Sequence, residues 1–258
     1  MPHEFELRKE VELDATPEQV WEAIATGPGV DSWFMGRTEI EPAEGGRGRF
    51  TMFGNSEGTT VTGYEPGKRF AFRGDGNPDG TFMAMEYLIE GRDHGSTVLR
   101  LVQHGFLGDD WETEFEAMGV GWDMYLHKLV QYLTYFRGRP ATVVSAVRPQ
   151  AAESAPAWAA IKDALGLPDT VRLGDPVRLA VDGLPPEDGV VDYTGFPAFL
   201  GLRTADGLYR FIHSGPKRGN VVVLGHHVFA ENADQEHVEA AWRSWLSRLF
   251  PRPSRTHL

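Results

Sequence analysis

The sequence of 258 residues predicts an α+β protein built from two units. Short stretches of alternating apolar residues, separated by turn residues, indicate antiparallel strands. Apolar residues at helical spacing occur before and after each group of strands, and a proline-bearing segment divides the two groups. Because the apolar face of a sheet and the apolar stripe of a helix must each be buried, we expect helices packed on one face of each sheet.

The first unit opens with a strand that ends near residue 13 and a helix that begins after Thr16. Thr16 can cap this helix, with Pro17 at its first position and Gln19 at its third. The Gly-Pro-Gly sequence at 27–29 ends it, and a second short helix is expected around residues 30–34.

A run of six strands follows, joined by short turns that favour an antiparallel meander. These strands are expected at residues 38–42, 48–54, 59–66, 69–74, 81–91 and 96–105. Residues 111–137 then form a long helix with a wide apolar stripe, which we expect to cover one face of the sheet.

The second unit repeats this order of elements in fewer residues. We expect helices at 155–165 and 235–249, with strands at 177–183, 189–195, 198–204, 208–214 and 220–229 between them. The prolines at 140 and 149 and the small residues around them indicate a linker. The predicted boundaries are therefore 1–140 for the first unit, 141–153 for the linker and 154–258 for the second unit.

Composition excludes several classes of function. The net charge is −12, of which −10 falls in residues 1–148, so a nucleic-acid partner is not expected. The absence of cysteine excludes disulfides, thiolate metal sites and a cysteine nucleophile. Neither a long apolar run nor an apolar leader occurs, so we expect a cytoplasmic protein without a membrane partner. Phosphate-binding and dinucleotide motifs are missing, and no cofactor is expected.

Five stretches in the first unit carry a family resemblance. They are VELDATPEQVWEAIATGPGVDSWF, GRFTMFG, VTGYEPGKRFAFR, GSTVLRLVQHGF and GWDMYLHKLVQYLTYFRG. Together they span about residues 5–138, which resembles the bacterial activator-of-heat-shock-protein-90-ATPase-like branch of the START-like (SRPBCC, birch-pollen-allergen-like) helix-grip superfamily. The resemblance implies a curved antiparallel sheet that grips a long C-terminal helix, with a ligand cavity between them. The second unit matches no family; it is either a partner-binding appendage or a truncated helix-grip-like copy.

Strand alternation identifies the strand side chains that face the long helix, and the second short helix and the long helix itself add two candidates each. The candidate cavity residues are Trp33, Phe34, Met52, Phe72, Met85, Tyr87, Leu101, Gln103, Trp122 and Tyr125. They form either a pocket for a hydrophobic or aromatic small molecule or simply a filled core. Gln103 is distinctive because an amide at an inward strand position must find hydrogen-bond partners.

Two polar clusters have structural and functional interpretations. Asp109, Asp110 and Glu112 precede or begin the long helix, where acids complement the helix dipole; they are also candidates for docking a basic protein partner. His226 and His227 are adjacent on a strand and point to opposite faces, so no metal site is assigned.

Three functions are compatible with these observations. The first is non-catalytic binding of a hydrophobic or aromatic small molecule between sheet and long helix. The second is a protein-interaction role similar to that of co-chaperone ATPase activators. The third is an enzyme similar to aromatic polyketide cyclases, with Tyr87, Gln103 or Tyr125 orienting substrate hydroxyls. We assign no catalytic residue, and the sequence does not indicate an oligomeric state.

Overall fold

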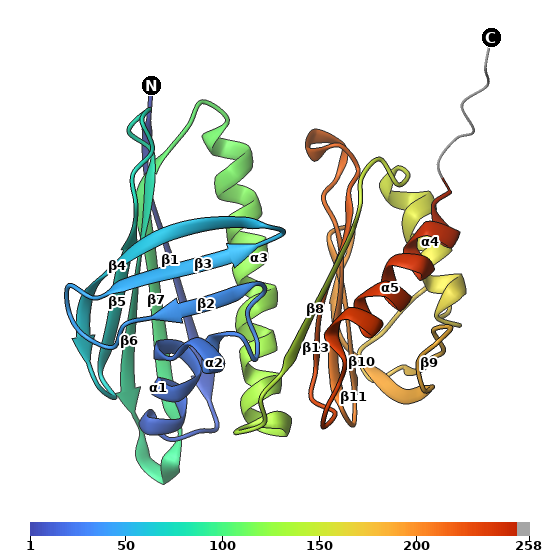
Figure 1. Ribbon diagram of the computed structural model, residues 1–258, viewed down its shortest axis with the longest axis horizontal. Helices are drawn as coiled ribbons and strands as arrows, with labels where there is room; N and C mark the ends of the chain where they lie inside the picture. The colour runs from blue at the N-terminus through green and yellow to red at the C-terminus, as the bar shows by residue number, and fades with distance from the viewer. Residues whose placement is uncertain (252–258) are drawn as a thin grey trace. The chain divides into compact units, whose positions relative to one another are not determined.

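The computed structural model describes residues 1–251 and confirms an α+β protein of two units. The first unit comprises residues 1–141, and the second begins at Thr142. Each unit consists of one antiparallel sheet with helices packed on it (Figure 1). No helix within residues 1–251 is long and apolar enough to cross a membrane.

The sheet of the first unit has seven strands in the order β1-β7-β6-β5-β4-β3-β2. Their bounds are β1 His3–Leu13, β2 Arg37–Ile40, β3 Arg47–Met52, β4 Asn55–Glu65, β5 Arg69–Gly74, β6 Phe82–Gly91 and β7 Thr97–Leu107. The helices are α1 Pro17–Ala25, α2 Gly27–Val30 and α3 Trp111–Gln131, which continues as a π-helical turn, Tyr132–Phe136. The sheet bends around α3, as Figure 1 shows.

The start of α1 follows from the predicted capping box. Thr16 Oγ1 accepts from Gln19 N at 3.4 Å, and Thr16 N donates to Gln19 Oε1 at 2.9 Å. These two bonds satisfy backbone donors that a helix start leaves without partners. The apolar stripe of α1 then buries Val20, Trp21 and Ile24 against the sheet.

The second unit has six strands in the order β8-β13-β12-β11-β10-β9. Their bounds are β8 Thr142–Arg148, β9 Pro176–Leu179, β10 Glu187–Gly195, β11 Phe199–Thr204, β12 Gly207–His213 and β13 Val222–Val228. Helices α4 (Ser154–Ala164) and α5 (Gln235–Leu249) lie on the same face of this sheet (Figure 1). Trp158, Phe211, Trp242 and Trp245 belong to the core between these helices and the sheet.

The linker predicted at residues 141–153 is wrong for its first half, because Thr142–Arg148 form β8. This strand pairs along its whole length with β13, for example Val144 with His226. Val144 and Ala146 are buried while Val147 is exposed, which is the alternation of a half-buried strand. Pro140 and Pro149 flank the strand, where proline does not interrupt its hydrogen bonds.

With β8 in place, the two units share one order of connection. In each, the first strand pairs with the last, and the strands between run in descending order across the sheet. Two helices follow the first strand in the first unit and one follows it in the second, and in each unit a long helix follows the last strand. The second unit thus has the truncated helix-grip-like plan, with one strand fewer than the first.

Candidate functional site

A cavity of about 210 Å³ lies inside the first unit. Its walls come from α1, the segment around α2, strands β2 to β7 and α3. Most lining side chains are aromatic, aliphatic or methionine: Ile24, Val30, Phe34, Ile40, Phe50, Val61, Phe70, Phe72, Met83, Met85 and Trp122. Such a lining favours an apolar occupant.

Five of the ten predicted cavity residues line this space. They are Phe34, Phe72, Met85, Gln103 and Trp122. Phe34 stacks on the Trp122 ring with centroids 5.5 Å apart, so the segment after α2 and the middle of α3 form one aromatic wall.

The other five predicted residues lie outside the cavity lining. Tyr87 and Leu101 face each other one inward position further along β6 and β7, and α1 contacts both of these strands. Trp33 is buried and donates its Nε1–H to Ala23 O at 2.8 Å. Tyr125 packs on Phe34, with ring centroids 4.5 Å apart, and Met52 ends β3. The space is therefore narrower than the inward pattern alone suggests.

The sequence did not predict the contribution of the edge strand β2 or that of β4. Thr38, Ile40, Glu57 and Thr59 line the cavity from these strands. The pairing register of β2, β3 and β4 places these residues on the cavity side. Thr38 pairs with Phe50 and Phe50 pairs with Glu57, and residues that pair across strands share a face of the sheet. Gly48 leaves room here: a β-carbon at this position would lie 2.4 Å from Thr59 Oγ1.

Gln103 is the buried polar group at the centre of the site. Its side-chain Oε1 accepts from Trp122 Nε1–H at 2.7 Å, and its Nε2 donates to Met83 Sδ at 3.2 Å. The partners come from α3 and β6, while Gln103 stands on β7. The predicted need for hydrogen-bond partners is thus met partly by a thioether, which is a weak acceptor.

Asp31 supports the edge of the site from the turn after α2. Its Oδ1 accepts from Thr38 N at 2.7 Å, which fixes the beginning of β2. Burial raises the pKa of Asp31 to about 6, and the hydrogen bonds with Thr38 and the charge of Arg37 offset only part of this effect.

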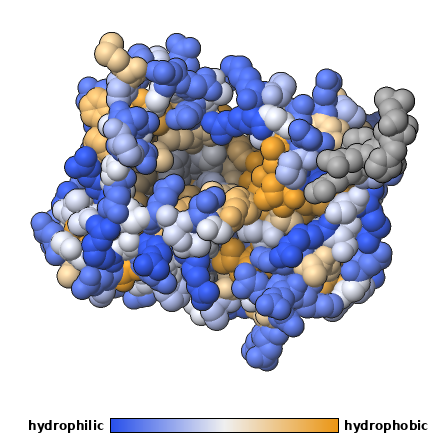
Figure 2. Space-filling model, turned by 45° about the horizontal axis from the view of Figure 1, so that its top comes forward, coloured by the Kyte–Doolittle hydropathy of each residue, from blue (hydrophilic) through white to orange (hydrophobic). Residues whose placement is uncertain are grey.

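A larger and more polar groove of about 490 Å³ adjoins the cavity, since both are lined by Glu57, Gly74 and Met83. Asp75 and Asp79 also line this groove. Arg47 holds the pKa of Asp75 below its usual value, and hydrogen bonds from Thr81 do the same for Asp79. In Figure 2 a hollow surrounded mainly by hydrophilic side chains is visible on the left of the molecule.

The three carboxylates predicted as a docking patch lie at the start of α3. Asp109 Oδ1 accepts from the N-terminal amine at 2.8 Å, which lowers the pKa of Asp109. Asp110 is the N-cap residue but makes no side-chain capping bond, and Glu112 lies in the first turn. The helix start accounts for all three, and their role in docking a partner stays a prediction.

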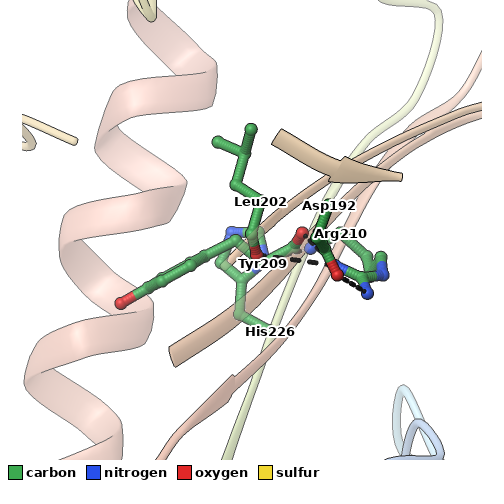
Figure 3. A network of polar contacts seen from close by, with 5 residues as sticks. All are labelled: Asp192, Leu202, Tyr209, Arg210 and His226. Carbon is green, nitrogen blue, oxygen red and sulfur yellow. Dashed lines mark hydrogen bonds and ion pairs between the residues drawn. The ribbon is translucent and has the colours of Figure 1, made fainter. Parts of the chain in front are cut away.

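The second unit contains a buried ion pair that spans β11, between the two strands that flank it in the sheet. Arg210 on β12 binds Asp192 on β10 in a bidentate manner, at 2.9 and 2.6 Å, as Figure 3 shows. Gly201 on the strand between them makes the space, because a β-carbon there would lie 2.7 Å from Arg210 Nη1. Tyr209 points the opposite way and donates to Glu187 Oε1 at 2.7 Å.

His226 and His227 lie on opposite faces of this sheet. The ring of His226 packs on Trp242 of α5, with centroids 4.4 Å apart, and its Nδ1 accepts from Arg210 N at 3.2 Å. His227 pairs with Leu208, on the face that also carries Arg210. Within residues 1–251, no three histidine, aspartate or glutamate side chains gather as metal ligands would.

The fold and the cavity define the first unit as a helix-grip domain, in which a bent antiparallel sheet encloses a long C-terminal helix and a mainly apolar space. Residues 14–134 match the family described as activator of Hsp90 ATPase homolog 1-like protein. The match lies within the first unit, and the resemblance seen in the sequence is confirmed.

Similar solved structures have low sequence identity to this chain. The di-domain ARO/CYC BexL from the BE-7585A biosynthetic pathway is 12% identical, with 96% of this chain and 100% of that chain covered and a TM-score of 0.47. DynU16 from the dynemicin biosynthetic locus is 19% identical, with 95% of each chain covered and a TM-score of 0.43. Protein MLL2253 from Mesorhizobium loti is 23% identical, with 51% of this chain and 98% of that chain covered and a TM-score of 0.45. No curated protein matches this chain significantly.

Proposed function

We propose that the first unit binds an apolar or aromatic small molecule in the cavity beside α3, without catalysing a reaction on it. The observation that carries this proposal is a space of about 210 Å³ lined by aromatic rings and methionines. A ligand there would remove its own apolar surface from water, which contributes about 25 cal/mol per Å². Met83 and Met85 would let the wall adapt to the shape of the occupant.

The proposal is tested by the thermal stability of the whole chain with a panel of a fatty acid, a mild detergent and a flat aromatic compound. A ligand at 100 times its Kd stabilises the folded state by about 2.7 kcal/mol, so at least one member should raise the Tm measurably. If no member of a broad panel shifts the Tm, the proposal is wrong.

A cavity-filling variant ties any shift to this space. Gly74 lines the cavity, and a β-carbon there meets its nearest neighbour, Met83 O, only at 3.4 Å. Gly74→Leu should therefore fold and lose the ligand-induced shift. Thr62→Leu adds the same side chain at an exposed position of β4 and should keep it. An equal ligand-induced rise in Tm in both variants would show that the ligand binds outside this cavity.

The cyclase hypothesis receives less support from the site. Of the three residues expected to orient substrate hydroxyls, Gln103 lines the cavity, whereas Tyr87 is buried beside it and Tyr125 packs behind Phe34. Non-catalytic binding requires only the apolar lining, so it is the function that the geometry favours.

A further inference from the structure

We infer that the ligand of this cavity carries a hydrogen-bond acceptor oxygen, such as the carbonyl of an aromatic ketone, and that the side-chain amide of Gln103 selects for it. This inference rests on the proposed function, because it concerns the same cavity. It adds the ligand's chemical class and the residue that recognises it.

Trp122 fixes which end of the amide faces the cavity. The indole nitrogen can only donate, so the group 2.7 Å away must be the oxygen of Gln103. If the amide were turned over, two donors would face each other in a buried site. Stacking of Trp122 on Phe34 holds the indole in place, and the NH₂ group is therefore directed away from α3.

The NH₂ group has only one partner, and that partner is weak. Gln103 Nε2 donates to Met83 Sδ at 3.2 Å, and thioether sulfur is a poor acceptor. Among the described residues no further acceptor bonds to Nε2, and Gln103 is buried, with 7% of the residue exposed. A buried donor with such a partner gains most from an acceptor that enters the cavity.

The remainder of the lining favours an aromatic carrier for this oxygen. Phe72 and Met85 form a neighbouring cross-strand pair, and Met85 pairs with Gln103 itself. A ring lying against this row would bury its faces on apolar side chains, and an oxygen on its edge could accept from the amide. The amide thus favours aromatic compounds that carry a carbonyl over those that do not.

The test compares 1-tetralone with tetralin, which differ by one carbonyl oxygen, by titration calorimetry on the full chain. The measured quantity is the ratio of the two affinities for each protein variant. The cost of removing water from the ketone carbonyl is the same for every variant, so it cancels when these ratios are compared. Gln103→Met keeps the size of the side chain and removes the amide. It should reduce the preference for tetralone by roughly three- to tenfold, the value of one neutral hydrogen bond.

Two further variants keep the test decisive. Met83→Leu removes the competing sulfur acceptor, retains the amide and should preserve or increase the preference. Trp122→Phe removes the indole donor, so the amide can turn over and the preference should fall, even if Gln103→Met does not fold. If the affinity ratio is the same in the wild type, in Gln103→Met and in Trp122→Phe, the acceptor inference is wrong, although ligand binding itself is not contradicted. Failure of both compounds to bind the wild type would contradict the proposed function as well.

Discussion

At the scale of single residues, the Asp31 carboxyl group links proton binding to stability. Its pKa of about 6 in the folded state exceeds the ordinary value of 3.8, so the folded protein binds this proton more tightly than the unfolded chain does. The contribution of Asp31 to stability is therefore most favourable below about pH 4 and is lost as the pH rises to about 6.

The variant Asp31→Asn tests this linkage. Asparagine retains an oxygen that can accept from Thr38 N, but it does not titrate. The free energy of unfolding, measured in urea from pH 4 to pH 7, should rise in the variant relative to the wild type as the pH increases. A constant difference across this range would show that Asp31 titrates as an ordinary exposed carboxyl group.

Gly201 provides a second prediction at this scale. A methyl group there would lie 2.7 Å from Arg210 Nη1 and 2.8 Å from Asp192 Oδ1, so the buried ion pair would have to move. Gly201→Ala should cost about 1–3 kcal/mol of unfolding free energy. Gly108→Ala, where nothing lies within 4 Å, is the matched control and should stay within about 0.5 kcal/mol of the wild type in the same denaturant titration.

At the scale of elements, α1 depends on its first turn. Thr16→Ala removes the hydroxyl that accepts from Gln19 N and should lower the unfolding free energy by about 1 kcal/mol. Thr16→Ser retains a hydroxyl and should restore most of this loss. Because Ile24 of the same helix lines the cavity, the alanine variant should also bind a cavity ligand more weakly; unchanged stability would show that the capping box is dispensable.

The elements also show what the sequence could predict. Alternation and capping residues located the helices and the central strands, since these signals are local. Strand β8 was missed because flanking prolines resemble a linker, and only its pairing with β13 identifies it. Tyr87 and Leu101 were predicted on the correct face of the sheet. Whether an inward side chain borders the cavity or is covered depends on how α1 packs on β6 and β7. That packing has no local signal.

At the scale of the whole molecule, the boundary between the units leads to a prediction about fragments. A fragment beginning at residue 142 contains all six strands of the second sheet, whereas one beginning at 154 lacks β8 and leaves one edge of β13 unpaired. The longer fragment keeps both neighbours of β13 and should unfold cooperatively in urea with the far-UV circular dichroism of an α+β protein. The shorter one should aggregate through its unpaired strand. Equal cooperativity of the two would show that β8 is dispensable.

The pairing of first and last strands has a consequence for synthesis on the ribosome. In the first unit His3 pairs with Leu107, and in the second unit Thr142 pairs with Val228. Neither sheet can therefore close until almost the whole unit has been translated. Such distant pairing is slow, yet β7 is finished before β8 is translated. The order of the chain therefore lets the first sheet close before strands of the second exist, which protects two similar sheets from exchanging partners in the nascent protein.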